Sequence, residues 1–339
     1  MRDNIILLSQ EGVWWNPAKG FHQLSLLLMK RKITAILIVI LVLALAACGT
    51  PNPTETAGDT VTFTDDLGRE VTSPAGPQRV AALIGSFADV WCLAGGRDTL
   101  VATADDAWTS FDLGLDEGVA NLGAIKSPSL ETLLATEPDL VLASANTAAN
   151  LELEDVLAGA GIPVAYFDVQ GFDDYLHMLD VCTRLTGKRE NYRTYGLDVQ
   201  NEIEKAVSRA DGSAPSVLVI RATGVSCKVK ASEGNVLGEM LADLGCVNVA
   251  DSDASLLENL SLEAIIAAEP DYIFAVLQGS DPTDAMETLE NTLLTNPAWS
   301  GLKTVREGRF YTMEHELYNL KPNARWGEAY EKLADILYP

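Results

Sequence analysis

The chain has 339 residues, of which 24 are Lys or Arg and 48 are Asp or Glu, so its formal net charge is −24 at pH 7. Phosphate backbones and anionic lipid head groups repel a chain this acidic, so we expect no nucleic-acid partner. The length suggests two domains, and an apolar content of 47% is sufficient for two hydrophobic cores.

Residues 1–47 have the pattern of a signal peptide, with a start at Met29, a basic segment and then an apolar run. That run is too short to span a bilayer comfortably. It ends in Leu-Ala-Ala-Cys48, which resembles the lipobox of bacterial lipoproteins. The resemblance implies cleavage before Cys48 and a lipid anchor on the extracytoplasmic face of the cell membrane. An uncleaved signal anchor is the alternative, and the residues before Met29 indicate an over-long start.

The mature chain divides into a stalk and two lobes. Residues 48–60 are rich in Pro, Thr and Gly, which is typical of a flexible linker. Residues 61–185 begin with a predicted hairpin and continue with short apolar runs that alternate with helical segments. Runs that are apolar on both faces predict the buried strands of a parallel sheet. The same alternation returns in residues 211–339, so the sequence predicts two α/β lobes.

Between the lobes, residues 186–210 carry no strand signal. Apolar side chains recur there at three- and four-residue steps from Tyr192 to Val207, which predicts one long helix that tolerates Gly196.

An internal repeat links the two lobes. Residues 129–144 read SLETLLATEPDLVLAS and residues 261–276 read SLEAIIAAEPDYIFAV, with half of the positions identical. In each copy the serine, Ser129 or Ser261, is the expected N-cap of a short helix, and Glu-Pro-Asp ends that helix before a buried strand. The repeat indicates that both lobes share one local plan.

The doubled Ser-Leu-Glu and Glu-Pro-Asp pattern, the lipobox, the long helix and the ending KPNARWGEAYEKLADILYP together resemble the periplasmic-binding family for ferric siderophores, haem and cobalamin. The resemblance covers about residues 60–339. It implies two Rossmann-like lobes joined by one long rigid α-helix, with an iron- or cobalt-containing ligand bound between them. It also implies ABC permease subunits as partners, with a cytoplasmic ATPase behind them.

In that family a glutamate on each lobe docks into the permease, and the matching positions here are Glu131 and Glu263. The alternative is that each carboxylate only stabilises the first turn of its own helix through the helix dipole.

Ligands of such folds bind beyond the carboxyl ends of the strands. The loops expected there carry Asn146 and Gln278, and three aromatic residues that suit a flat or apolar ligand, Trp108, Tyr318 and Phe87. For Trp108 and Tyr318 the alternative is packing within a lobe, and for Phe87 it is packing beneath the adjacent helix. The segment Ser86-Phe87-Ala88-Asp89 also resembles a capping box.

Two further residues are candidates for ligand binding. Arg221 follows an apolar strand and is suited to pair with a carboxylate on the ligand, the alternative being a salt bridge within the protein. His315, like the nearby Met313, is a candidate axial ligand for haem iron, although a lone loop histidine is more often solvated.

We expect no resident cofactor, no protein-held metal and no enzymatic activity. No phosphate-binding loop, nucleophile elbow or HExxH motif is present, and the mature chain has only His177 and His315. Cys92, Cys182, Cys227 and Cys246 form no zinc pattern, so free thiols are expected, with a Cys227–Cys246 disulfide as the alternative. The competing functions are a free zinc or manganese receptor and a surface lipoprotein or adhesin without a transport role.

Overall fold

The N-terminal lobe is built on a parallel sheet that follows a hairpin. The structure, a computed structural model, describes residues 60–258, 260–279 and 282–339, so the predicted signal peptide and Cys48 lie outside it. As expected, β1 (Thr60–Thr64) and β2 (Glu70–Pro74) pair antiparallel. The sheet has the order β5-β4-β3-β6-β7 with parallel pairing throughout. Its strands are β3 (Val80–Ala82), β4 (Leu100–Thr103), β5 (Ala120–Asn121), β6 (Leu140–Ser144) and β7 (Val164–Phe167).

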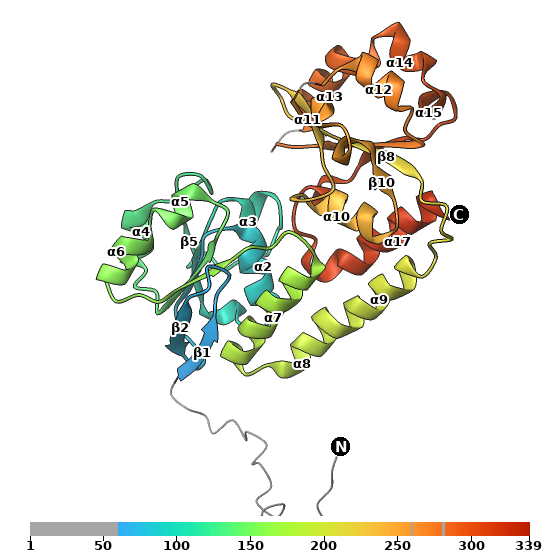
Figure 1. The fold of residues 1–339 in the computed structure, drawn as a ribbon. Coiled ribbons are helices and arrows are strands. Elements are labelled where there is room, and N and C mark those ends of the chain that lie inside the picture. Colours follow the sequence, from blue (N-terminus) through green and yellow to red (C-terminus); the bar gives the residue numbers. More distant parts are fainter. Residues whose placement is uncertain (1–59, 259, 280–281) are drawn as a thin grey trace, which may run out of the picture. The chain divides into compact units, whose positions relative to one another are not determined.

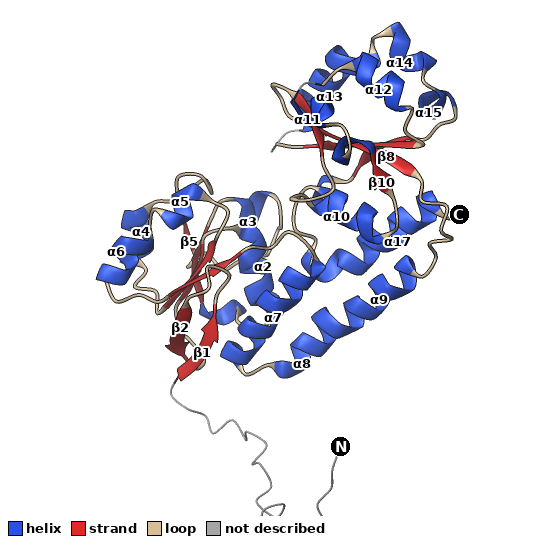
Figure 2. Cartoon of the chain, viewed as in Figure 1, coloured by secondary structure: helices blue, strands red, loops and turns tan. Residues whose placement is uncertain are grey.

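Helices cover both faces of this sheet (Figures 1 and 2). On one face lie α4 (Leu130–Ala135), α5 (Ala148–Leu151) and α6 (Glu154–Gly159), whose apolar residues pack against Val141 and Ala143. On the other face, α2 (Gly85–Leu93) and α7 (Phe172–Thr186) pack against Leu140 and Leu142. Since neighbouring residues of β6 enter opposite cores, the strand is buried on both sides, as the apolar run predicts.

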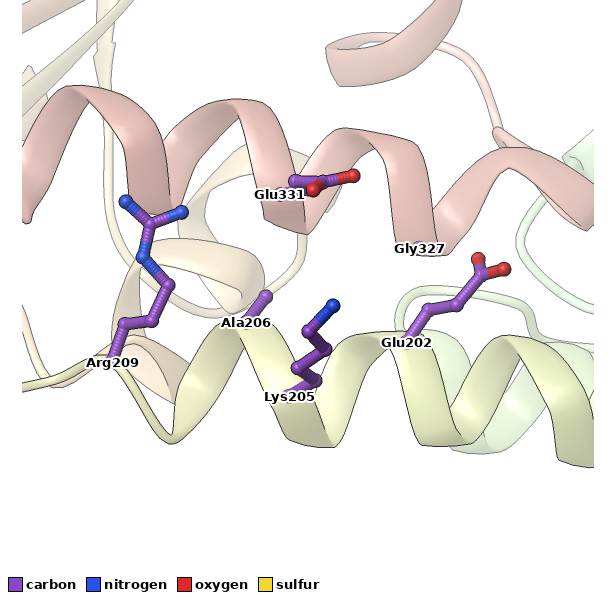
Figure 3. A pocket seen from close by; sticks show the side chains of 6 residues that line it. All are labelled: Glu202, Lys205, Ala206, Arg209, Gly327 and Glu331. Atoms are coloured by element: carbon purple, nitrogen blue, oxygen red, sulfur yellow. The ribbon is translucent and has the colours of Figure 1, made fainter. Parts of the chain in front are cut away.

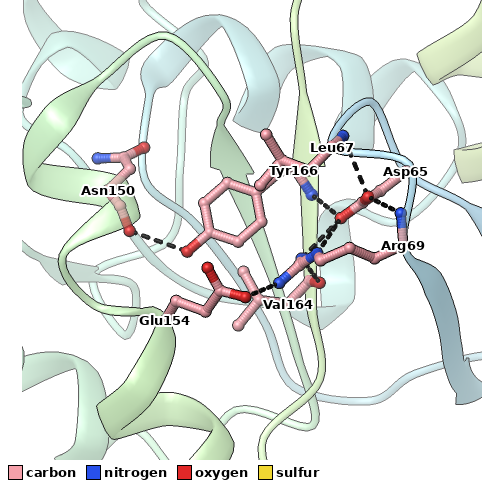
Figure 4. Close-up of polar contacts among 7 residues, drawn as sticks. All are labelled: Asp65, Leu67, Arg69, Asn150, Glu154, Val164 and Tyr166. Carbon is pink, nitrogen blue, oxygen red and sulfur yellow. Dashed lines mark hydrogen bonds and ion pairs between the residues drawn. The ribbon is translucent and has the colours of Figure 1, made fainter.

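An arginine fastens the hairpin to this lobe (Figure 4). The Arg69 guanidinium donates to the Asp65 carboxylate, to Glu154 at the start of α6 and to the Val164 carbonyl oxygen of β7. The same guanidinium lies over the Tyr166 ring, 4.6 Å from its centroid. Asp65 is buried, and its ion pair with Arg69 compensates the negative charge that is removed from water.

The middle of the chain forms a helix that begins later than the sequence suggested. Gly187, at φ 70°, ends α7 in the left-handed conformation, so the following helix begins at Arg189 and not at residue 186. It runs through α8 (Arg189–Tyr192), the π-helical segment η2 (Arg193–Leu197) and α9 (Asp198–Val207). Within η2, the Tyr195 carbonyl oxygen accepts a 2.8 Å hydrogen bond from the Tyr175 hydroxyl of α7.

The C-terminal lobe has a second sheet of order β10-β8-β11-β12, with parallel pairing among these strands and β9 antiparallel to β8. Its strands are β8 (Ser216–Ala222), β9 (Cys227–Lys230), β10 (Val247–Asn248), β11 (Tyr272–Leu277) and β12 (Phe310–Met313). The helices on one face include α12 (Leu262–Ala268), α13 (Pro282–Leu289) and α14 (Pro297–Gly301). On the other face lie α10 (Val236–Asp243) and α17 (Trp326–Leu337).

One hydrophobic core reaches from the first lobe to the second. It contains Leu142 of β6, Leu179 of α7, Ile203 of α9, Leu333 of α17 and Val219 of β8. Helices α9 and α17 approach closely (Figure 3) because Gly327 has no side chain. A Cβ atom there would lie 2.7 Å from Cβ of Glu202. The two predicted α/β lobes are therefore confirmed. The predicted single connecting helix contains the π-helical segment η2, and its residues pack in the core that both lobes share.

The internal repeat has the same structure in both copies. Ser129 accepts a hydrogen bond from the Thr132 backbone N–H and Ser261 from that of Ala264, as predicted for N-caps. The two carboxylates of the Glu-Pro-Asp triplets also correspond. Asp139 accepts from the backbone N–H groups just before β3, and Asp271 accepts from that of Ser216 at the start of β8. No helix among the described residues is long and apolar enough to span a membrane.

Candidate ligand-binding site

Basic side chains gather at the carboxyl end of the C-terminal sheet. Strand register places Lys228 of β9 opposite Arg221 of β8, and Arg221 opposite Val276 of β11. Lys230 pairs with Val219, two residues before Arg221, so it lies on the same face of the sheet. Val219 and Val276 belong to the core shared with α10 and α17. The three cations therefore line one face, at the edge where ligands of α/β sheets bind.

Lys321, in the loop before α17, belongs to the same cluster. Burial and the nearby Arg221 guanidinium lower the pKa of Lys321, while Asp168 and Asp174 act in the opposite direction. Burial also lowers the pKa of Arg221. The pKa of Lys230 is lowered by its burial and by the charges of Arg221 and Lys228. These four side chains form what we call the cation cluster: Arg221, Lys228, Lys230 and Lys321.

His315 lies at the carboxyl edge of the same sheet in a defined orientation. Its Nδ1 donates a 2.7 Å hydrogen bond to the Leu277 carbonyl oxygen at the end of β11, which leaves Nε2 as the free ring nitrogen. The next residue, Gln278, is exposed and is held by a 2.7 Å hydrogen bond from its backbone N–H to the Ala222 carbonyl oxygen. Arg221, Gln278 and His315 thus lie at the ends of neighbouring strands, as predicted.

A cavity of about 290 Å³ adjoins Lys321. Residues of both lobes line it, among them Asp89 and Phe111 from the first, and Glu316, Lys321 and Arg325 from the second. Next to it, the Asn323 side chain donates to the Ser86 carbonyl oxygen at 2.9 Å and to Oδ2 of Asp89 at 2.8 Å. The predicted capping box at Ser86 and Asp89 does not form, because Ile84 is the N-cap of α2 and Asp89 accepts from Asn323.

The first lobe presents Trp108 and Asn146 at its own strand ends. Trp108 is half-buried in α3 (Asp106–Thr109), which is positioned by a 2.9 Å hydrogen bond from the Gly85 N–H to Oδ1 of Asp106. Burial raises the pKa of Asp106 to about 6. Asn146 is exposed and its side-chain amide donates to Asp168.

Two of the aromatic residues predicted to contact ligand are core residues instead. Phe87 is 3% exposed and packs edge-on against Phe167, so it packs α2 onto the sheet. Tyr318 is also 3% exposed, and its hydroxyl donates a 3.0 Å hydrogen bond to the Ala329 carbonyl oxygen of α17. Neither ring is accessible to a ligand. Cys227 and Cys246 are free thiols, which removes the disulfide alternative.

Lys228, Lys230 and Lys321 were missed in the sequence analysis. The segment Cys-Lys-Val-Lys alternates cations with other residues directly after the Thr-Gly-Val-Ser turn, so its period of two was the available signal for a strand. Nothing in the sequence near Lys321 indicates that its side chain is half-buried and that the charge of Arg221 acts on it. That interaction follows only from the tertiary fold.

Glu131 and Glu263 are exposed at matching positions of the repeat. Each lies in the first turn of its helix, α4 or α12. The Ser261 hydroxyl donates to Glu263 at 3.0 Å, and hydrogen bonds to the carboxylate lower its pKa. Within the described ranges, no group of three or more His, Cys, Asp or Glu residues is arranged to hold a metal ion.

Comparisons with known proteins identify the family by its model and the fold by solved structures. The family described as "Periplasmic binding protein" matches residues 80–317. The iron-uptake system-binding protein of Bacillus subtilis is 24% identical over 318 residues, which cover 90% of this chain and 96% of that protein. Among solved structures, the periplasmic haem-binding protein RhuT from Roseiflexus has a TM-score of 0.63 at 22% identity, covering 78% of this chain and 98% of RhuT. Staphylococcus aureus SirA complexed with staphyloferrin B also has a TM-score of 0.63, at 20% identity, covering 82% of this chain and 97% of SirA.

Proposed function

Because the chain belongs to the periplasmic binding protein family, we propose that it is the extracytoplasmic substrate-binding subunit of an ABC importer. Its substrate is a bulky metal chelate such as a ferric siderophore, haem or a cobalamin-type corrinoid. Two relatives support the iron or haem substrate by name, the iron-uptake protein of Bacillus subtilis and the haem-binding RhuT.

The observation that carries this proposal is the matched pair Glu131 and Glu263. An importer subunit needs to be recognised by the permease through both lobes at once, and the repeat gives each lobe an exposed carboxylate in the same structural position. A protein that only binds a ligand or a surface does not require matched carboxylates on both lobes. We therefore propose that these two carboxylates dock into basic sites on the permease.

The ligand site comprises strand ends of both lobes. Arg221, Gln278 and His315 from the second lobe, with Trp108 and Asn146 from the first, are the predicted ligand-binding residues that remain accessible. His315 keeps two alternatives open, since its free Nε2 is suited either to bind iron or to be hydrated. Energy for import comes from the partner ATPase. Cys48 is the proposed lipidation site, which would hold the protein at the outer face of the membrane.

The test is uptake of a radioactive iron chelate by cells whose native chain is replaced by the double variant Glu131→Gln/Glu263→Gln. We expect uptake to fall by at least ten-fold while the purified variant binds the chelate as before. The matched control is Glu137→Gln/Glu269→Gln, which removes the same charges from the other exposed glutamates of the repeat.

Equal uptake by both double variants would contradict docking through Glu131 and Glu263. An unchanged uptake on deletion of the whole chain would contradict the transport role itself and would favour the adhesin alternative.

A further inference from the structure

The four members of the cation cluster have no hydrogen-bond or ion-pair partners in the part of the chain that the structure describes. No ion pair or side-chain hydrogen bond joins these cations to any residue of the described ranges. The four are Arg221, Lys228, Lys230 and Lys321. Arg221, Lys230 and Lys321 are half-buried, whereas Lys228 is exposed. Half-buried cations normally find a partner, because an unpaired charge away from bulk water lacks compensation for its lost hydration. An unpaired group of four is therefore a feature that needs an explanation.

A shortage of acids does not explain it, because acidic residues outnumber basic ones by two to one in this chain. Other cations do form pairs. Arg189 bonds to Asp180 at 2.7 Å, and Lys332 bonds to Glu314 at 2.6 Å and to Glu328 at 3.1 Å. The cation cluster is left without such acids although the surface supplies them elsewhere.

The two acids whose charges act on Lys321, Asp168 and Asp174, are engaged with other groups. Asp174 accepts hydrogen bonds from the backbone N–H groups of Gln170 and Gly171 at the start of α7. Asp168 accepts from the side-chain amides of Asn146 and Gln170. Both carboxylates lie close enough to affect Lys321 electrostatically, yet their hydrogen bonds stabilise loops of the first lobe. The cation cluster thus remains available for a group that the protein does not itself supply.

The positions of the four cations favour one ligand over separate ions. Arg221 and Lys228 are direct cross-strand partners, and Lys230 follows on the same face. Lys321 interacts with Arg221 from the loop before α17. Like charges so close repel one another, and strand pairing gains nothing from them. An anionic ligand that contacts several of them relieves this repulsion.

We infer that the cation cluster selects the substrate by charge, so that the protein takes up acidic metal chelates with two or more ionised groups and rejects uncharged ones. The substrate class is a ferric complex bearing carboxylate or catecholate groups, or a haem with its two carboxylates, and an uncharged corrinoid is excluded. The planar guanidinium of Arg221 is suited to a bidentate contact with a carboxylate, and the lysines act as mobile point charges. This inference rests on the proposed function and narrows its substrate class.

The experiment is isothermal titration of the purified full-length chain with five probes. Three are acidic: ferric citrate, the ferric complex of 2,3-dihydroxybenzoate, and haemin. Two are uncharged: ferric tris(acetohydroxamate) and cyanocobalamin. We expect an acidic probe to bind more tightly than either uncharged one, with an affinity that weakens as salt is raised.

Two variants then test whether the cation cluster causes the selectivity for acidic probes. Arg221→Gln and Lys321→Gln should each weaken binding of the acidic probe by about ten- to hundred-fold, because each removes a charged hydrogen-bond donor. The matched control is Lys303→Gln/Arg306→Gln, which removes two exposed cations from α15 (Lys303–Arg306), a helix packed on the opposite face of the same sheet. Circular-dichroism melting confirms that every variant is folded.

The outcomes separate this inference from the proposed function. Tighter binding of an uncharged chelate or corrinoid overturns selection by charge and leaves the importer proposal standing. An equal loss of affinity in the control overturns the role of the cation cluster, because overall charge would then be sufficient. A folded chain that binds none of the five probes overturns both.

Discussion

The Asn323 side-chain amide donates to Oδ2 of Asp89 at 2.8 Å, which joins the 3-10 turn just before α17 to α2 of the first lobe. Asn323 is 1% exposed and has a positive φ of 51°, a conformation that asparagine tolerates better than most residues. Burial raises the pKa of Asp89, and the Asn323 hydrogen bond and the Arg97 charge oppose this rise. The two residues form a polar contact between elements of different lobes.

Asn323→Ala is expected to lower the free energy of unfolding by about 2–3 kcal/mol. The substitution removes two hydrogen bonds, leaves the buried Asp89 carboxylate without its amide donor and places alanine at a positive φ. Urea unfolding provides the measurement. Asn319→Ala is the matched control, since the Asn319 side chain bonds to no described residue. Equal unfolding midpoints for the two variants would contradict the role of this contact.

Asp106 is expected to make stability depend on pH. Its folded-state pKa is raised to about 6, mainly by burial, from an ordinary value of 3.8. A carboxyl group with a raised folded-state pKa stabilises the fold at pH values below 3.8, and that contribution is lost as the pH rises through 6. Asp106→Asn, which keeps an oxygen acceptor for the Gly85 N–H, should therefore be neutral at pH 4 and stabilising by roughly 1–3 kcal/mol at pH 8. A gain that is the same at both pH values would rule out this explanation.

Gly327→Ala tests the close contact between α9 and α17. In an exposed helix, alanine is more stable than glycine by about 1 kcal/mol. At position 327, however, the new Cβ would lie 2.1 Å from Oε2 and 2.7 Å from Cβ of Glu202. We expect a loss of about 1–3 kcal/mol in thermal or urea unfolding. Gly301→Ala in α14 meets no atom within 4 Å and should not lose stability.

The shared core also predicts a small conformational response to ligand. Residues from both sheets and from α7, α9 and α17 pack in one cluster, so a large rotation of one lobe would expose apolar surface. Solution scattering of the purified chain should give nearly the same radius of gyration with and without a saturating chelate. A marked compaction on binding would show that the core does not restrict the lobes.

The features that could be predicted from sequence are those with a local cause. The N-caps Ser129 and Ser261, the buried strands after each Glu-Pro-Asp and the exposure of Glu131 and Glu263 all follow from short patterns. The predicted connecting helix starts too early, at residue 186, because Gly187, the left-handed C-cap of α7, was not recognised as a helix end.

The ligand site was predicted less well because burial of a loop residue depends on distant elements. Phe87 and Tyr318 follow strands, as ligand-binding aromatics do, but Phe87 packs against Phe167 of β7 and Tyr318 bonds to α17. Lys321 becomes part of the site only because the loop before α17 brings it next to Arg221, exactly 100 residues earlier in the sequence. No periodicity or motif encodes that contact.

Lys321→Met is the last prediction, and it separates stability from binding. Burial and Arg221 lower the pKa of Lys321, so its charged form is less favourable in the folded chain than in the unfolded one. Without ligand, the variant should therefore be more stable than the native chain by about 1 kcal/mol at pH 7, while it binds acidic chelates more weakly. The gain should shrink as the pH rises toward 10.5, the ordinary pKa of lysine, because the native side chain then loses its charge in both states. Thermal unfolding at several pH values measures this, and a less stable variant at pH 7 would show that Lys321 supports the fold through packing of its aliphatic chain.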